Sequence, residues 1–181
     1  MDDLRHLATL LAQRNGLDSA ISAIIHRPAT SGHLGEFIAA QVFNIELEAS
    51  ASHKSSDGHF REGSLAGRSV DVKFYGKQEG LLAVQEGAQP DYFLVLSEPE
   101  AAPSASRGHT QPSLIEHVYL FRGEDLAADI RKRGVKFGVA ASIPRANWLA
   151  AEVFPTPANP ELVLTQEQRQ LLALFSSKAG A

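Results

Sequence analysis

The sequence predicts an α/β domain with a mixed central β-sheet, helices packed on its faces and a helical extension at the N-terminus. Apolar residues recur at helical spacing between residues 3 and 43. Residues 68–75 alternate between apolar and polar side chains, which is typical of a strand with one buried face. Residues 92–96 form a continuous apolar run, which is typical of a strand buried on both faces.

Composition sets limits on the class of protein. The 181 residues suggest a single domain, and the 44% hydrophobic and 21% charged residues are typical of a globular protein. The absence of cysteine excludes disulfides and thiolate metal sites. The acidic start of the chain lacks the features of a signal peptide, and no apolar run approaches the ~20 residues that span a bilayer, so we expect a cytoplasmic protein. The net charge of −4 weighs against a protein that binds nucleic acid through its overall charge.

Three helices are predicted before the first strand. The first covers residues 3–15 and ends at Gly16, and the second covers residues 18–25 with Asp18 as its N-cap. The third covers Gly32–Phe43, and its two early glycines allow close packing against another backbone.

The alternating segment is predicted to form one arm of a β-hairpin. Residues 57–62 supply the other arm, and the glycine-containing residues 63–67 supply the turn. Because side chains two apart share a face of a strand, Asp71 and Lys73 point the same way, opposite to the apolar residues between and beside them.

The register of this hairpin has two alternatives. If the turn centres on Leu65, Asp57 lies across from Lys73, and if it centres on Ser64, Asp57 lies across from Asp71. In both registers the two carboxylates and the ammonium share one face, with opposed Cβ atoms roughly 5 Å apart.

The second half of the chain alternates strands and helices. A polar, irregular stretch is expected before the hairpin, at residues 46–56. Beyond the hairpin we expect a short helix at 81–84, the buried strand at 92–96 and a surface loop at 98–113. A strand at 115–122, a helix at 124–133 and a strand at 137–143 follow. The chain then forms a helix from Pro144, a stiff linker at 155–160 and a last helix capped by Thr165 with Gln168.

Four residues in this order of elements resemble the PD-(D/E)XK nuclease superfamily, which includes restriction endonucleases. They are an acid on a helix, Glu36, an acid on the first hairpin strand, Asp57, and the triad Asp71-Val72-Lys73 on the second. The Gly-x-x-Gly-Glu start of the helix also looks like small uncharacterised bacterial proteins of that fold. The resemblance covers about residues 32–96 and departs from the motif at Ser56, where the superfamily pattern has proline.

The resemblance implies a restriction endonuclease-like core and a Mg²⁺-dependent nuclease that hydrolyses phosphodiester bonds in DNA, with Mn²⁺ as a substitute. Asp57 and Asp71 are the expected metal ligands, with the Val72 carbonyl as a third. Lys73 is expected to position or deprotonate the attacking water, and Glu36 to hold a second metal or a metal-bound water. The chain then divides into an N-terminal helical extension (1–31), a nuclease-like α/β core (32–154), and a linker with a C-terminal helix (155–181).

Simpler interpretations compete with this one. Asp71 and Lys73 are also compatible with the solvated face of an amphipathic strand, and Glu36 with an exposed charge that suits the N-terminal end of a helix dipole. His53, Asp57 and His59 are a possible zinc site, although their spacing matches no compact zinc motif.

Two further alternatives concern partners. The basic run 131–133 with Lys136 is either a phosphate-contact patch or a set of cations favoured at a helix C-terminus. The same fold could also serve as a non-catalytic binding or assembly module. Finally, the apolar residues of the first 25 positions exceed what a small core needs, which predicts a homodimer through the N-terminal helices.

Overall fold

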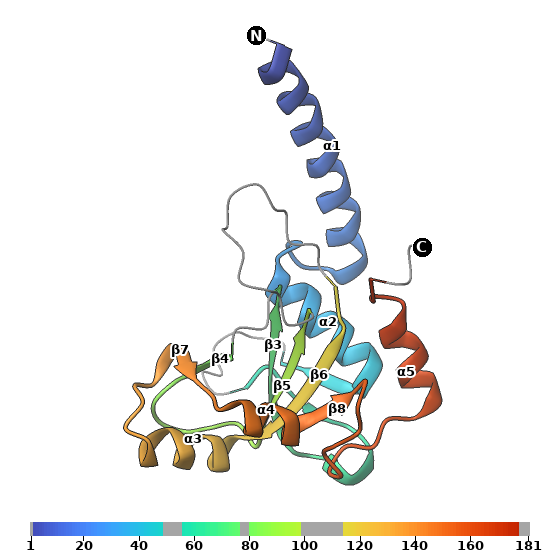
Figure 1. The fold of residues 1–181 in the computed structure, drawn as a ribbon. Coiled ribbons are helices and arrows are strands. Elements are labelled where there is room, and N and C mark those ends of the chain that lie inside the picture. Colours follow the sequence, from blue (N-terminus) through green and yellow to red (C-terminus); the bar gives the residue numbers. More distant parts are fainter. Residues whose placement is uncertain (1, 49–55, 77–79, 99–113, 178–181) are drawn as a thin grey trace.

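The centre of the molecule is a mixed six-stranded sheet with helices on its faces, seen in a computed structural model that describes residues 2–48, 56–76, 80–98 and 114–177 (Figure 1). The strands are β1 (Ile45–Leu47), β2 (Gly58–Phe60), β3 (Ser69–Tyr75), β4 (Leu81–Val84), β5 (Tyr92–Ser97), β6 (His117–Arg122), β7 (Gly138–Ser142) and β8 (Glu152–Phe154). The helices are α1 (Asp2–Ile25), α2 (Ser31–Phe43), α3 (Gly123–Lys132), α4 (Arg145–Ala151) and α5 (Gln166–Ala173), with a 3₁₀ turn at Gly63–Leu65. The prediction of a mixed sheet flanked by helices is confirmed.

The strand order in the sheet is β1-β2-β3-β5-β6-β8, and β4 pairs with β7 in a separate two-stranded sheet. Only β3 and β5 run parallel, and every other described pair is antiparallel. The chain between β3 and β5 passes through β4, so it crosses over one face of the main sheet before it returns.

Each face of the sheet packs into its own apolar core. The even-numbered residues Val70 and Val72 of β3 join a core with α2 and α5, whereas the odd-numbered Tyr75 packs against a core formed with β4, β7, α3 and α4. Strand β5 is buried along its whole length, as its continuous apolar run predicted, because helices or strands cover it on both sides.

The N-terminal extension is one helix, so the prediction of two helices with a stop at Gly16 is wrong. α1 runs unbroken for 24 residues and projects beyond the sheet (Figure 1). A glycine inside a helix costs only about 1 kcal/mol relative to alanine, which the rest of the helix can offset. No helix of the described ranges is both long and apolar enough to cross a membrane.

Three short strands also differ from expectation. Residues 81–84 form β4 and not a helix, because they pair with β7. β1 lies in the stretch predicted to be irregular, and β8 follows α4 directly where no strand was predicted. The remaining predicted strands and helices are present within a few residues of the expected ends, and the capping box of Thr165 and Gln168 is confirmed. Of the predicted loop, residues 99–113 lie outside the described part of the chain.

α2 lies unusually close to β3 because its fifth residue is glycine. A Cβ atom on Gly35 would stand 2.5 Å from the Cβ of Phe74, a distance that real side chains do not reach. A Cβ on Gly32 would meet no atom within 4 Å, so only one of the two early glycines serves this close approach. The contact places Glu36, the next residue, beside the sheet.

Replacing Gly35 by alanine should therefore destabilise the protein by about 1–3 kcal/mol, as overpacked substitutions do. For a domain of this size, thermal unfolding should shift down by roughly 2–4 °C per kcal/mol. Gly32→Ala is the matched control and should leave the melting temperature unchanged or raise it, because alanine favours the helix and meets no neighbour. Equal melting temperatures for the two variants would contradict the close contact.

Candidate active site

The β2–β3 hairpin has the register that centres on Ser64. Gly58 pairs with Val70 and His59 pairs with Ser69, so the ladder is symmetric about Ser64 and ends at Gly58, the residue after Asp57. The 3₁₀ turn between the strands fixes this choice. The first of the two alternatives read from the sequence, with Leu65 at the centre, is wrong.

Asp57 stands where β2 ends, while β3 continues in its pairing with β5. Its backbone N–H donates to the Val70 carbonyl at 2.9 Å, and its Oδ2 accepts the Val72 N–H at 2.7 Å. The carboxylate therefore takes the place of a ladder partner that β2 no longer supplies. Because the N–H and C=O of one strand residue point toward the same neighbour, the Val72 carbonyl faces this edge as well.

Asp71 and Lys73 form an ion pair on the neighbouring positions of β3. Lys73 Nζ lies 2.5 Å from Asp71 Oδ1, and the two side chains are only 26% and 19% exposed. Oδ1 is buried, and the ammonium beside it compensates its charge by Coulomb attraction and by a hydrogen bond. This burial does not fit the alternative in which both residues belong to a solvated strand face.

The carboxyl groups of Asp57 and Asp71 are close enough to share a hydrogen bond. The pKa of Asp71 is raised to about 7, first because burial disfavours the charged form, and then because of repulsion and a hydrogen bond with Asp57. The Lys73 ammonium acts in the opposite direction and lowers the pKa of Asp71. Near neutral pH the Asp71 carboxyl thus keeps a proton for part of the time, and a bound cation can replace that proton.

Glu36 lies near this pair but is bonded elsewhere. Its Oε2 accepts from Arg27 Nη1 at 2.6 Å, and its side chain is 17% exposed, so it is not the solvent-facing helix charge of the simpler interpretation. Burial and the charge of Asp57 raise the pKa of Glu36, while Arg27 lowers it. α2 covers the face of the sheet opposite to Asp71, so Glu36 reaches the acidic pair only from beyond the strand edge.

The atoms at this edge that could bind a metal ion are all oxygens. Two carboxylates and the Val72 carbonyl suit a hard divalent cation such as Mg²⁺. Among the described residues, no set of three or more His, Asp or Glu side chains is arranged to hold a metal ion, so Glu36 does not complete a three-carboxylate site in this conformation. The zinc alternative has His53 outside the described residues, and His59 contacts Glu46 at 3.4 Å.

Two nearby side chains escaped the sequence analysis. Arg27, which binds Glu36, also donates to the Glu48 carbonyl at 3.3 Å and so ties the segment after α1 to the end of β1. No local pattern marks it. Tyr75 follows Asp71 and Lys73 on the same face by simple alternation, and its hydroxyl accepts the Ala83 N–H at 3.0 Å. Burial raises the pKa of Tyr75.

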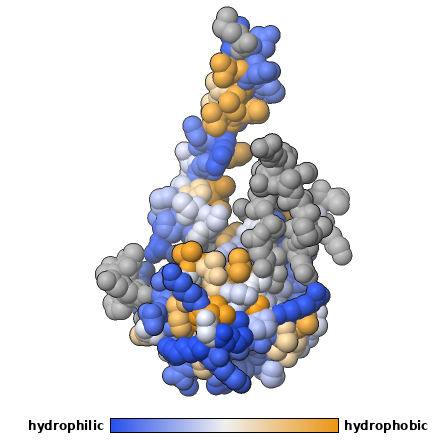
Figure 2. Space-filling view, turned by 60° about the vertical axis from the view of Figure 1, so that its left-hand side comes forward, coloured by the Kyte–Doolittle hydropathy of each residue, from blue (hydrophilic) through white to orange (hydrophobic). Residues whose placement is uncertain are grey.

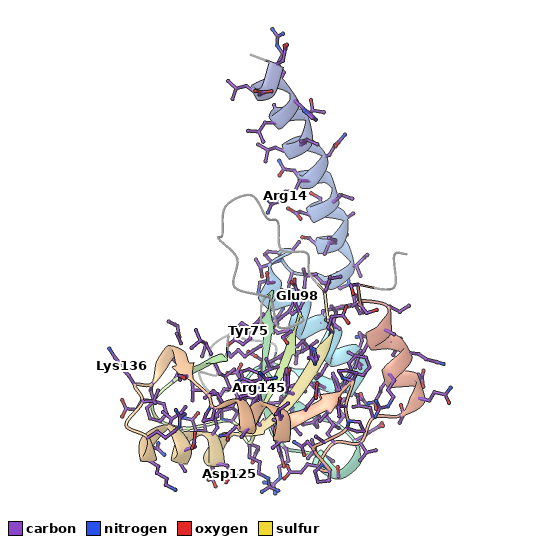
Figure 3. All side chains as sticks on the ribbon, in the orientation of Figure 1. Arg14, Tyr75, Glu98, Asp125, Lys136 and Arg145 are labelled. Carbon is purple, nitrogen blue, oxygen red and sulfur yellow. The ribbon has the colours of Figure 1, made fainter. Side chains whose placement is uncertain are left out.

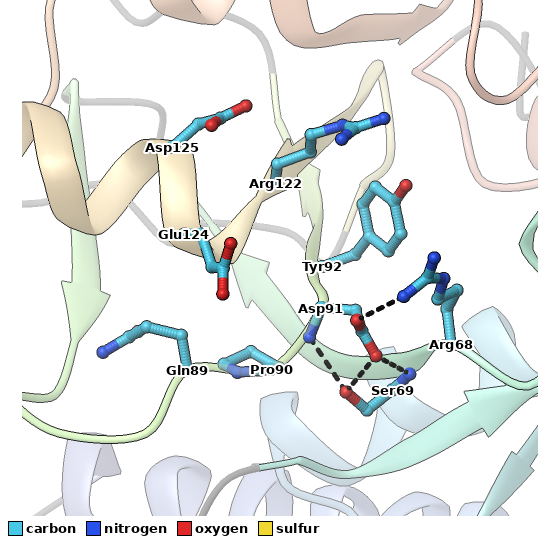
Figure 4. Close-up of a pocket in the computed structure, with 9 residues that line it drawn as sticks. All are labelled: Arg68, Ser69, Gln89, Pro90, Asp91, Tyr92, Arg122, Glu124 and Asp125. Atoms are coloured by element: carbon cyan, nitrogen blue, oxygen red, sulfur yellow. Dashed lines mark hydrogen bonds and ion pairs between the residues drawn. The ribbon is translucent and has the colours of Figure 1, made fainter.

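A separate hollow of about 390 Å³ lies where β3 and β5 begin (Figure 4). Asp91 Oδ2 accepts both the N–H and the hydroxyl of Ser69 at 2.8 Å, and its Oδ1 accepts from Arg68 at 3.1 Å. These bonds join the first residues of β3 to the residue before β5 and hold the pKa of Asp91 below its usual range. The hollow contains none of the predicted site residues. The charged residues that line it connect β3 with β5.

The basic run at the end of α3 is mostly engaged in the fold. Arg133 binds Asp129 at 2.8 Å and the Ser142 carbonyl at 2.7 Å, and the Arg131 guanidinium lies 5.3 Å from the centre of the Phe137 ring. Lys136 points outward from the loop before β7 (Figure 3). These contacts favour a structural role over a dedicated phosphate patch.

In comparisons with known proteins, the sequence matches no protein-family model and no curated protein.

Proposed function

We propose that this chain is a metal-dependent nuclease of the PD-(D/E)XK type, with a restriction endonuclease-like core, that hydrolyses phosphodiester bonds in DNA. The observation that carries the proposal is the meeting of the Asp57 and Asp71 carboxyls at the edge where β2 ends, with Lys73 paired to Asp71. Two carboxylates alone are common in proteins. Two carboxyls that share a largely buried site with one ammonium, beside the end of a strand, are typical of a catalytic centre.

Asp57, Asp71 and the Val72 carbonyl are the residues that would hold the metal ion. A bound Mg²⁺ or Mn²⁺ supplies an acidified water and offsets charge on the phosphate. Asp57 is held in place by its bond to the Val72 N–H, so one carboxylate oxygen is already oriented by the backbone. Asp71 is the group that must lose a proton before it can act as a ligand, because its pKa is raised to about 7.

Lys73 would act on the water and the phosphate. Its ammonium is half-buried beside Asp71, on the face that also carries Tyr75, and it brings a positive charge to a site that otherwise repels a phosphodiester. We assign it to the orientation or deprotonation of the attacking water and to neutralisation of the charge that develops on the phosphate. It is not a metal ligand.

Glu36 takes a supporting role in this proposal. Its negative charge adds to the field at Asp57 and Lys73, while its bond to Arg27 keeps it off the metal ligands. A role as a ligand of a second metal or of a metal-bound water requires that it leave Arg27.

A non-catalytic binding or assembly module is the second candidate. The net charge of −4 and the absence of a three-carboxylate cluster among the described residues favour it. The two candidates differ in one outcome: a nuclease cleaves DNA when a divalent metal is added, and a non-catalytic module does not.

The experiment is incubation of the purified chain with plasmid DNA and with single-stranded DNA, in Mg²⁺ or Mn²⁺ and in EDTA. We expect cleavage of DNA with either metal and none in EDTA. Binding of the metal without cleavage of either substrate would favour the non-catalytic module. Parallel reactions with RNA show whether cleavage depends on the sugar of the nucleic acid.

A further inference from the structure

The apolar residues of α1 lie on its surface and not in the core. Leu4 is 71% exposed, Leu17 66% and Ile24 65%, and only Ile25, at the junction with the body, is buried. The helix projects from the sheet (Figure 1), and apolar surface extends along it in the space-filling view (Figure 2). A helix of this composition needs a partner to cover these side chains.

These residues follow a strict seven-residue repeat. All eight leucines and isoleucines of α1 fall into three neighbouring columns of a heptad. The first column contains Leu7, Arg14 and Ile21, the second Asp3, Leu10, Leu17 and Ile24, and the third Leu4, Leu11, Asp18 and Ile25. The columns on the far side hold polar residues, alanine and Gly16. A period of 3.5 residues predicts a left-handed coiled coil, in which the first two columns form the seam.

We propose that α1 pairs with α1 of a second copy of this chain, in an antiparallel two-helix coiled coil. The proposal does not depend on the proposed nuclease activity. In an antiparallel pair the first column of one helix faces the second column of the other, so the numbers of facing residues add up to 31. The resulting layers match apolar residues throughout, except at the middle of the helix.

The charges in the middle of α1 decide the direction of the pair. In a parallel pair, Arg14 would face Arg14 of the second copy, which places two like charges in the seam. In the antiparallel pair, Arg14 faces Leu17 of the second copy and lies next to its Asp18. Within one helix Arg14 already lies 3.6 Å from Asp18, so the two side chains can exchange partners across the seam.

The charges at the ends of α1 also favour the antiparallel direction. The first turn contains Asp2 and Asp3, and the last turn contains no basic residue. A parallel pair would bring the two acidic tips together, whereas the antiparallel pair places them at opposite ends. A 24-residue helix is about 36 Å long, so the two sheet domains lie at opposite ends of the pair and do not obstruct it.

The test is the molar mass of the full chain in solution, measured by light scattering and sedimentation. The protein concentration is varied over about 1–50 μM, which covers micromolar dissociation constants. We expect twice the chain mass of 19.5 kDa. Leu10→Glu with Leu17→Glu places two charges in the seam and should weaken the dimer at least 100-fold. Ala12→Glu with Ser19→Glu places the same charges on the far side of the helix and should leave it dimeric. All four positions are exposed, so neither variant disturbs the folded core.

Cysteine cross-linking tests the direction, because the chain has no cysteine of its own. Leu7 and Ile24 face each other across the antiparallel pair, whereas Leu7 lies about 25 Å from Leu7 of the second copy at 1.5 Å per residue. The double variant Leu7→Cys with Ile24→Cys should form a covalent dimer under mild oxidation, and the two single variants should not. A monomer at 50 μM, a dimer unaffected by the seam charges, or efficient cross-linking of the single Leu7→Cys variant would each overturn the proposal.

Discussion

Replacing Lys73 by alanine is expected to abolish DNA cleavage while divalent-metal binding persists. The expected loss is about 10²–10⁴-fold in rate, the usual size of a contribution from a positioned acid, base or counter-charge. In the proposed mechanism Lys73 acts on the water and the phosphate, so its removal leaves both proposed carboxylate ligands in place. Asp71→Asn should remove cleavage and metal binding together.

Two controls make this result interpretable. Lys73 lowers the pKa of Asp71, so Lys73→Ala should raise it, and the variant must be assayed up to about pH 9 to keep Asp71 ionised. Lys132→Ala removes an exposed lysine of α3 and should cleave like the wild type, which shows that the loss of a lysine charge alone is not sufficient. Equal rates for the wild type and Lys73→Ala would dispose of the catalytic proposal.

The second large effect concerns thermal stability. At ten times its dissociation constant, Mg²⁺ should stabilise the folded protein by about 1.4 kcal/mol, because it binds the folded site and not the unfolded chain. For a domain of this size that amounts to roughly 3–6 °C in melting temperature. Asp57→Asn should lose most of this gain, since it removes one ligand charge.

Without metal, Asp57→Asn should melt above the wild type. An asparagine oxygen can still accept the Val72 N–H, while the repulsion that Asp57 exerts on Asp71 and Glu36 disappears. Asp125→Asn is the matched control: Asp125 is exposed and lies at the far end of the sheet (Figure 3), so it should leave the Mg²⁺ shift intact. Curves at matched ionic strength that show no metal-dependent gap between the wild type and Asp57→Asn would rule out the site.

The same measurement should depend on pH in a defined direction. The folded-state pKa of Asp71 is about 7 against an ordinary value of 3.8, so the folded protein holds a proton that the unfolded chain has lost. Its contribution to the stability of the metal-free protein is therefore present below about pH 4 and is lost as the pH rises to about 7. Mg²⁺ must displace that proton, so its stabilising effect should grow over the same rise in pH. Asp71→Asn should remove both trends.

The parts of the site that follow from local pattern could be predicted. Alternation placed Asp71 and Lys73 on one face of β3, and the structure shows them there, paired to each other. The hairpin register remained open because a five-residue glycine-containing turn allows two centres, and only the 3₁₀ turn at 63–65 selects one. The partner of Glu36 could not be predicted, since the position of Arg27 depends on the path of the chain between two helices.

Short elements and tertiary pairing explain the remaining differences. Strands of three residues, such as β1 and β8, are too short to show a period of two. The four apolar residues of β4 fit a helix or a strand equally well, and pairing with β7 decides between them. The continuous α1 shows the opposite case, in which a single local signal, Gly16, is too weak to end a helix.

The last third of the chain has a consequence for synthesis on the ribosome. The core beneath Val70 and Val72 also contains Leu164 and Leu172, and Gln168 donates to the Val42 carbonyl at 3.0 Å. At about 5–20 residues per second, roughly 5–20 s separate the translation of β3 from that of α5. A nascent chain thus carries every residue of the acidic site while one face of its sheet still lacks its cover. We therefore expect the proposed site to become functional only once α5 has been synthesised and has packed on this face of the sheet.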